Sequence, residues 1–155
     1  MPATPRTPDI ETAAMLLESI PSLMRSIREE FSSVSDSKVS IGQFRVMCML
    51  REEPQTNGEL ASATGVAAPT MSRLIDAFET RGLVERRKSK ADRRQQSLVL
   101  TTQGRRETDR IREAIRLRMA ARIARLPENR RKTLFDGLKV LEELFENDPG
   151  KGRSH

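Results

Sequence analysis

Residues 82–100 read GLVERRKSKADRRQQSLVL and contain two short β-prone runs, 83–88 and 95–100, on either side of a charged tip. The residues before them follow a helical pattern that ends at Arg81 and Gly82. A helix followed at once by a small hairpin is typical of a winged helix. Between Val84 and Leu100 the hairpin carries six basic and two acidic residues, so we expect an anionic partner opposite it.

Length and composition favour one small domain. The chain has 155 residues, a formal net charge of +6 and a hydrophobic content of 36%, which suit a single domain with a lean core. No apolar run approaches the roughly 20 residues that span a bilayer. The first eight residues include three prolines and lack the apolar centre of a signal peptide. We therefore expect a cytoplasmic protein that makes no membrane contact.

The residue types that catalysis and metal binding need are scarce. The chain has one cysteine, Cys48, and one histidine, His155, which excludes an internal disulfide and a histidine-based metal site within one chain. The sequence contains no nucleophile–base set, no phosphate-cradling glycine loop and no cluster of metal ligands. We expect that the protein is not an enzyme and binds no metal or cofactor.

Two short helices joined by a tight turn precede the hairpin. Thr56 is followed by Glu59 at the spacing of a capping box, and Gly65 supplies a turn. Ala68 and Pro69 open the next helix, because proline in the first turn loses no hydrogen bond. Its inner stripe consists of Met71, Leu74, Ile75 and Phe78. The pattern predicts a helix-turn-helix followed by a wing.

Four further segments complete a mainly α fold with one small β-hairpin. A helix begins at Asp9, with a kink or break expected near Ser19–Pro21 because proline interrupts it. Residues 41–51 are apolar nearly all round, which predicts a central buried helix. Thr101 or Thr102 caps a long helix that reaches Leu126, and Pro127 starts the last one. We expect a single domain over 9–148, with tails at 1–8 and 149–155.

The outer helices carry more apolar surface than a winged helix needs for its own core. The stripes that we expect to be buried between subunits include Ile10, Leu17, Leu134, Leu138, Leu141 and Phe145. They predict dimerisation helices over 9–33 and 102–147, flanking a winged helix-turn-helix over 41–101. The alternative is that these helices only cover their own domain, which would leave a sizeable apolar patch exposed.

Several short motifs in order resemble the MarR type of winged-helix transcription regulators. The matching residues are Gln43–Val46, Gly58–Ala61, Pro69–Ile75, Glu79–Arg86, Asp92–Arg94 and Leu100–Gly104. The resemblance implies a homodimer on a pseudo-palindromic DNA operator, often a repressor released by a small-molecule effector or by thiol oxidation. One departure is Ala67–Ala68, where the family commonly has Ser or Thr to cap the recognition helix.

We expect double-stranded DNA to contact two groups of residues. In the helix-turn-helix these are Thr56, Pro69, Thr70, Ser72 and Arg73. In the wing they are Arg86, Lys88, Lys90, Asp92, Arg93 and Arg94. Asp92 would hold Arg94 while its guanidinium enters the minor groove.

Three alternatives remain open. Cys48 could be an oxidation sensor, although its apolar neighbours favour a packing role. A winged helix can also bind protein or RNA in place of duplex DNA. Many of the arginines between 105 and 131 are consistent with solvated helix faces.

Overall fold

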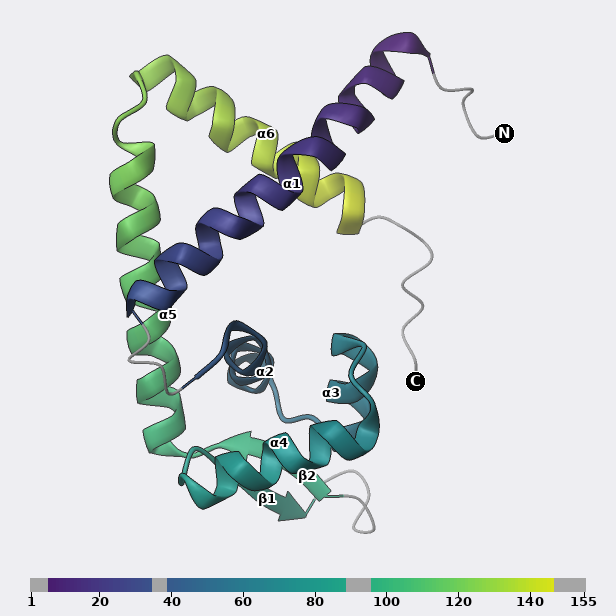
Figure 1. Cartoon of the computed structure of the whole chain (residues 1–155), viewed down its shortest axis with the longest axis vertical. Helices are drawn as coiled ribbons and strands as arrows, with labels where there is room; N and C mark the ends of the chain where they lie inside the picture. The colour runs from purple at the N-terminus through teal and green to yellow at the C-terminus, as the bar shows by residue number, and fades with distance from the viewer. Residues whose placement is uncertain (1–5, 35–38, 89–95, 147–155) are drawn as a thin grey trace. The chain divides into compact units, whose positions relative to one another are not determined.

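Six helices and a two-stranded hairpin make up the residues that the computed structural model describes, which are 6–34, 39–88 and 96–146 (Figure 1). The elements in chain order are α1 (Thr7–Val34), α2 (Ile41–Glu52), α3 (Asn57–Thr64), α4 (Ala68–Thr80), β1 (Val84–Lys88), β2 (Gln96–Leu100), α5 (Thr102–Ile123) and α6 (Glu128–Glu146). This confirms the mainly α winged helix-turn-helix predicted from the sequence. The chain divides into two compact units, Met1–Ile115 and Arg116–His155, and α5 runs from the first into the second.

Capping boxes start two of the helices. The Ser40 hydroxyl accepts from the Gln43 backbone N–H, and the Gln43 side chain accepts from the Ser40 backbone. Thr56 and Glu59 repeat this arrangement at α3. Each box satisfies two backbone donors that a helix start otherwise leaves unpaired. At the other end of α3, Gly65 takes the left-handed conformation (φ +71°) that turns the chain toward α4.

The two strands form an antiparallel hairpin in which Val84 pairs with Leu100 and Lys88 with Gln96. Gln55, just before α3, adds a third short segment through two hydrogen bonds with Leu98, of 2.7 and 3.3 Å. β2 is therefore hydrogen-bonded both to β1 and to the segment just before α3.

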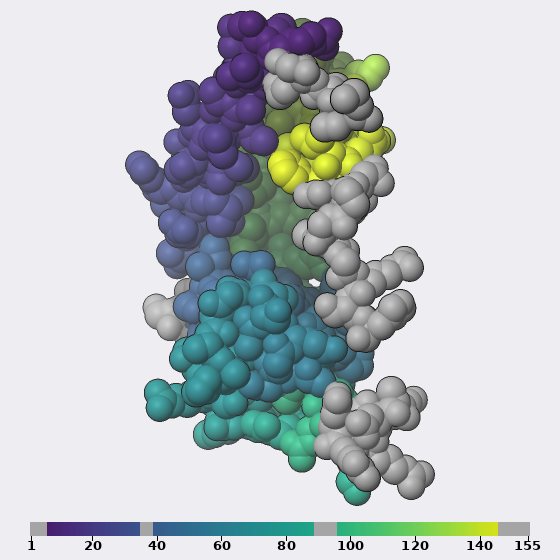
Figure 2. Space-filling model, turned by 90° about the vertical axis from the view of Figure 1, so that its right-hand side faces the viewer, coloured from purple at the N-terminus to yellow at the C-terminus, as the bar shows by residue number. Residues whose placement is uncertain are grey.

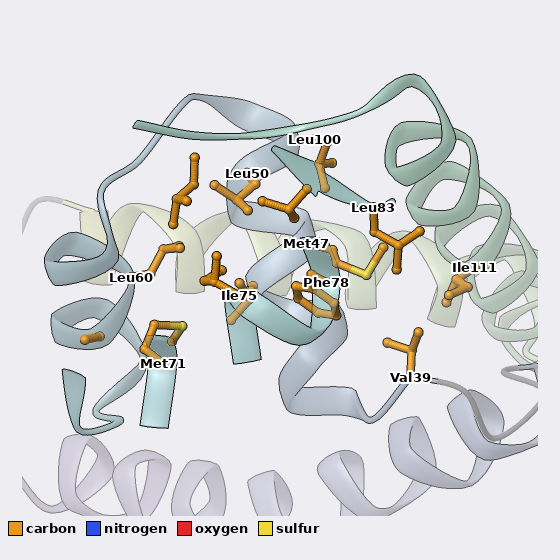
Figure 3. Close-up of a cluster of buried hydrophobic side chains, with 14 of the residues drawn as sticks. Val39, Met47, Leu50, Leu60, Met71, Ile75, Phe78, Leu83, Leu100 and Ile111 are labelled. Atoms are coloured by element: carbon orange, nitrogen blue, oxygen red, sulfur yellow. The ribbon is translucent and has the colours of Figure 1, made fainter. Parts of the chain in front are cut away.

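The core lies where α2, α4 and the sheet meet (Figure 3). Met47, Met71, Ile75 and Phe78 are completely buried, and side chains from the strands and from Ile111 of α5 surround them (Figure 3). On the far side of α2, the rings of Phe31 and Phe44 lie 5.4 Å apart and join α1 to α2. This close packing buries one face of α4 in the core and leaves the opposite face free for other contacts.

Two predictions about helices were wrong. The break near Ser19–Pro21 does not occur, because α1 continues through Pro21 to Val34. Pro21 removes one hydrogen bond, to the Leu17 carbonyl, and the remaining turns of the 28-residue helix keep α1 continuous. The second prediction concerned α2, which does have a solvent-facing side, at Gly42, Arg45 and Glu52. It buries Val46, Met47 and Leu50 and leaves Cys48 half-buried.

Helix boundaries differ slightly from the predicted ones. The first helix begins at Thr7, and α5 ends at Ile123, three residues before the predicted Leu126. Thr101 is the cap of α5, since its hydroxyl accepts from the Gly104 N–H at 3.0 Å. Pro127 precedes α6 directly, as predicted.

The junction between the wing and α5 is tight. Leu83 donates its N–H to Phe78 at the end of α4 and accepts from the N–H of Thr101. The Thr101 hydroxyl also donates to the Gly82 carbonyl at 2.6 Å. Gly104 packs so closely here that a Cβ would lie 2.0 Å from the Leu83 carbonyl oxygen. Only glycine fits at this position.

Candidate nucleic-acid interface

The helix α4 presents a polar strip to solvent. Pro69, Thr70 and Arg73 are exposed and Ser72 is half-buried, whereas Met71 and Ile75 on the opposite side are completely buried. The residues of α3 and α4 lie at the surface on the face shown in Figure 2. The structure thus places the predicted major-groove residues together on one outward strip of the recognition helix.

The start of α4 has no side-chain cap. Ala67 occupies the N-cap position in an extended conformation (φ −60°, ψ 139°), and no side chain accepts from the first turn. Pro69 in the first turn removes one unpaired N–H. Asn57 of α3 donates its side-chain N–H to the Ala68 carbonyl at 3.2 Å and so links the two helices of the motif. The Asn57 Oδ1 atom is buried and has no hydrogen-bond partner among the described residues.

Thr56 has a structural task. Its hydroxyl accepts from the Glu59 N–H at 3.2 Å and donates to a Glu59 carboxylate oxygen at 2.9 Å. The hydroxyl therefore uses its donor and one acceptor position within the capping box. The predicted contact of Thr56 with DNA stays a prediction.

Within the described part of the wing, the cations lie on β1. Arg86 donates from Nη2 to Asp76 at 2.6 Å and from Nε to Glu79 at 2.8 Å. The hydrogen bond to Glu79 is the main cause of a raised pKa of the Arg86 guanidinium, so this group stays charged. Arg87 pairs with Glu85 on the same strand, and Lys88 is exposed. The predicted phosphate contacts of Arg86 and Lys88 remain predictions.

The remaining predicted wing contacts lie outside the described residues. These are Lys90, Asp92, Arg93 and Arg94 in segment 89–95. Their assignment rests on the sequence.

The sequence prediction missed two acidic residues of the site. Asp76 and Glu79 lie one turn apart on α4, and Arg86 reaches both across the junction with the wing. Their i,i+3 spacing puts them side by side on a helix, a signal that was present in the sequence. Their pairing with Arg86 depends on how the hairpin packs against α4, and residue spacing in the sequence does not predict that packing.

Cys48 is half-buried on α2. Burial raises the pKa of its thiol, and Arg112 opposes that shift to a smaller extent. A thiol with a raised pKa forms little thiolate near neutral pH, so the environment disfavours oxidation chemistry.

The predicted dimerisation residues expose their apolar side chains. Ile10 is 60% exposed, Leu17 69%, Leu138 51% and Phe145 52%. Leu134 is 39% exposed, and Leu141 is half-buried. Apolar side chains of this size in regular stripes are typical of a surface that another chain covers.

A cleft of about 820 Å³ lies where the end of α4 and the wing meet α5. The residues around it include Arg81, Leu83, Gln103, Arg106, Glu107 and Arg110. In the described parts of the chain, no three His, Cys, Asp or Glu side chains are grouped to hold a metal ion. None of the helices in those parts has the length and apolar character needed to cross a membrane.

Comparison with known proteins gives consistent matches in fold. The crystal structure of RV1404 from Mycobacterium tuberculosis has a TM-score of 0.74 at 24% identity, covering 98% of this chain and 100% of that chain. The transcriptional regulator Tm0710 from Thermotoga maritima has a TM-score of 0.70 at 24% identity, covering 89% and 99%. The transcriptional repressor CouR, bound to a 23-mer DNA duplex, has a TM-score of 0.64 at 27% identity, covering 85% and 95%. A comparison with curated protein sequences finds no match.

The family comparison covers α2, the helix-turn-helix and the first strand of the wing. The model of the MarR family matches residues 39–95, which begin before α2 and end within the hairpin. The family and the structural neighbours named above as regulators act in transcription, not as enzymes, in agreement with the sequence prediction. Residues 39–95 therefore match the MarR family, and the chain shares its fold with solved transcription regulators.

Proposed function

We propose that this protein is a homodimeric, cytoplasmic transcription regulator that binds a pseudo-palindromic site in double-stranded DNA and acts as a repressor. The observation that carries the proposal is the outward strip of Thr70, Ser72 and Arg73 on a helix whose other face is completely buried. Donors and acceptors on such a strip suit the edges of base pairs in the major groove.

The wing supplies positive charge that complements the phosphates of DNA. Lys88 is exposed at the end of β1, and the sequence places Lys90, Arg93 and Arg94 directly after it. Cations that neutralise phosphates release counterions, so we expect the affinity to fall steeply with salt. The DNA complex of CouR, a neighbour at 27% identity, supports duplex DNA over RNA or protein as the partner.

Two copies of the chain would present two recognition helices to the two halves of the site. The exposed stripes of α1 and α6 supply apolar surface for such an assembly. Half-sites about one helical turn apart would then follow from the symmetry of the dimer.

A small-molecule effector would release the protein from DNA. The cleft beside the end of α4 is lined by Arg81, Arg106 and Arg110, and by Glu107, which is paired with Arg110. The excess of cations favours an anionic ligand that contacts the end of α4 and α5 together. Release through oxidation of Cys48 is the weaker alternative, since burial raises the pKa of that thiol.

The test is a mobility-shift assay on the upstream region of the protein's own gene, with heparin and RNA as competitors. We expect a complex that survives heparin and RNA, followed by a short protected region in a footprint. Aromatic carboxylates added to the complex test for effector release. A protein that prefers RNA, or that shows no protected region on any genomic fragment, would contradict the proposal.

A further inference from the structure

The guanidinium of Arg86 is held between two carboxylates of the recognition helix. It lies 2.6 Å from Asp76 and 2.8 Å from Glu79, through two different nitrogen atoms. The Arg86 and Glu79 side chains are each about two-thirds buried, with exposed fractions of 34% and 32%. A fork-shaped group bound on both sides has fixed geometry, unlike a cation that extends into solvent.

The position of Asp76 makes this pairing relevant to DNA. Asp76 follows Arg73 by three residues and Ser72 by four, so it lies one turn further along the same exposed strip. Its side chain is 65% exposed. An unpaired carboxylate on this strip would repel the phosphates of a duplex that reaches Arg73.

We infer that Arg86 is a positioning residue, which fixes the wing against the recognition helix and neutralises the carboxylates of Asp76 and Glu79 where DNA approaches. The inference rests on the proposed function and replaces the simpler view of Arg86 as a phosphate contact. The hairpin and the helix then move as one body, and the angle between wing and recognition helix is set before DNA binds.

The experiment measures operator affinity for Arg86→Gln in two backgrounds, the wild type and Asp76→Asn/Glu79→Gln. A positioning residue loses its role once both carboxylates are removed. We expect the glutamine substitution to weaken binding about tenfold in the wild type and less than twofold in the second background. Because no phosphate contact is lost, the slope of log affinity against log salt should stay unchanged.

Lys88→Gln is the matched control, since it removes one charge two residues further along the same strand. We expect it to weaken binding equally in both backgrounds and to reduce the salt slope by about 0.9. If Arg86→Gln behaves as Lys88→Gln does, Arg86 is a phosphate contact and the inference is wrong. Should the glutamine variant not fold, Arg86→Lys in the same two backgrounds gives the same test with a smaller expected loss.

A second readout needs no DNA. Hydrogen exchange of the free protein should show faster exchange of the β1 amides in Arg86→Gln, with the amides of α2 unchanged. Unchanged β1 amides would overturn the positioning role even if the protein binds no DNA. Absence of DNA binding by the wild type, with faster β1 exchange in the variant, would refute the proposed function alone.

Discussion

Arg73 is the exposed cation on the outward strip of α4, and its removal should affect binding more than folding. We expect Arg73→Ala to reduce specific operator affinity by about 1–3 kcal/mol, because a contact with a base edge or phosphate is lost. Thermal stability should be nearly unchanged, since the side chain is exposed. Fluorescence anisotropy and a melting curve measure the two effects.

Arg125→Ala, which removes the same charge from the exposed connection after α5, serves as the control for Arg73. It should leave the specific affinity close to that of the wild type. Equal losses in the two variants would mean that net charge alone accounts for the effect of Arg73.

Cys48 gives a prediction about pH. Burial raises the pKa of its thiol in the folded protein, so the neutral thiol favours folding at pH values below the pKa of the unfolded chain, about 8.5. This contribution is lost as the pH rises through the higher folded pKa. The unfolding free energy of the wild type should therefore decline relative to that of Cys48→Ser between pH 7 and pH 10, in denaturant titrations.

Treatment with peroxide tests whether Cys48 controls DNA binding. If the thiol serves packing, mild peroxide should leave DNA binding the same in wild type and Cys48→Ser. Release of DNA from the wild type, abolished in the serine variant, would identify Cys48 as an oxidation sensor.

At the scale of elements, the recognition helix can be stabilised at its start. Ala67 has the extended backbone of an N-cap and lacks a side chain that can accept a hydrogen bond. Ala67→Ser should raise the unfolding free energy by about 1 kcal/mol, measured by chemical denaturation. Ala63→Ser, at an exposed position in the last turn of α3, is the control and should lower it slightly, because serine is a poorer helix former than alanine. Equal effects at the two positions would refute the capping explanation.

The junction between wing and α5 should tolerate no side chain at Gly104. A Cβ there would lie 2.0 Å from the Leu83 carbonyl oxygen, so the backbone must shift. We expect Gly104→Ala to lower the unfolding free energy by about 1–3 kcal/mol in denaturant titrations. Gly42→Ala, where the nearest atom is the Ser40 hydroxyl at 3.9 Å, should cause no loss. Similar losses in both variants would exclude the steric explanation.

The sequence predicted those elements whose signals are local. The capping box of Thr56 and Glu59, the turn at Gly65 and the proline near the start of α4 each act within a few residues. The continuous α1 was not predicted, because whether a proline breaks a helix depends on the stability of the turns around it. The ion pairs of Arg86 and the close approach at Gly104 were not predicted either, since both depend on how distant segments pack.

At the scale of the whole molecule, the exposed stripe of α6 should control assembly. Replacing Leu138 and Leu141 by Asp puts charges into the apolar surface proposed to lie between subunits. We expect unfolded or monomeric protein without operator binding, as measured by light scattering and a mobility shift. A well-folded wild-type monomer at micromolar concentration would contradict the proposed dimer.

Val140→Asp is the control for this substitution. Val140 is 63% exposed on the same helix and lies off the stripe of Leu138 and Leu141. We expect the variant to remain dimeric and to bind DNA. Loss of assembly in this variant too would mean that the effect is not specific to the stripe of Leu138 and Leu141.

The two backbone hydrogen bonds of Leu83 restrict where the chain can gain or lose residues. Its N–H and its carbonyl are both engaged, one with the end of α4 and the other with the start of α5. An inserted or deleted residue between Arg81 and Val84 would move one of these bonds out of register, and it would also shift every side chain of β1 to the opposite face. Length variation compatible with this architecture must therefore occur elsewhere, for example in the exposed connection 124–127 between α5 and α6.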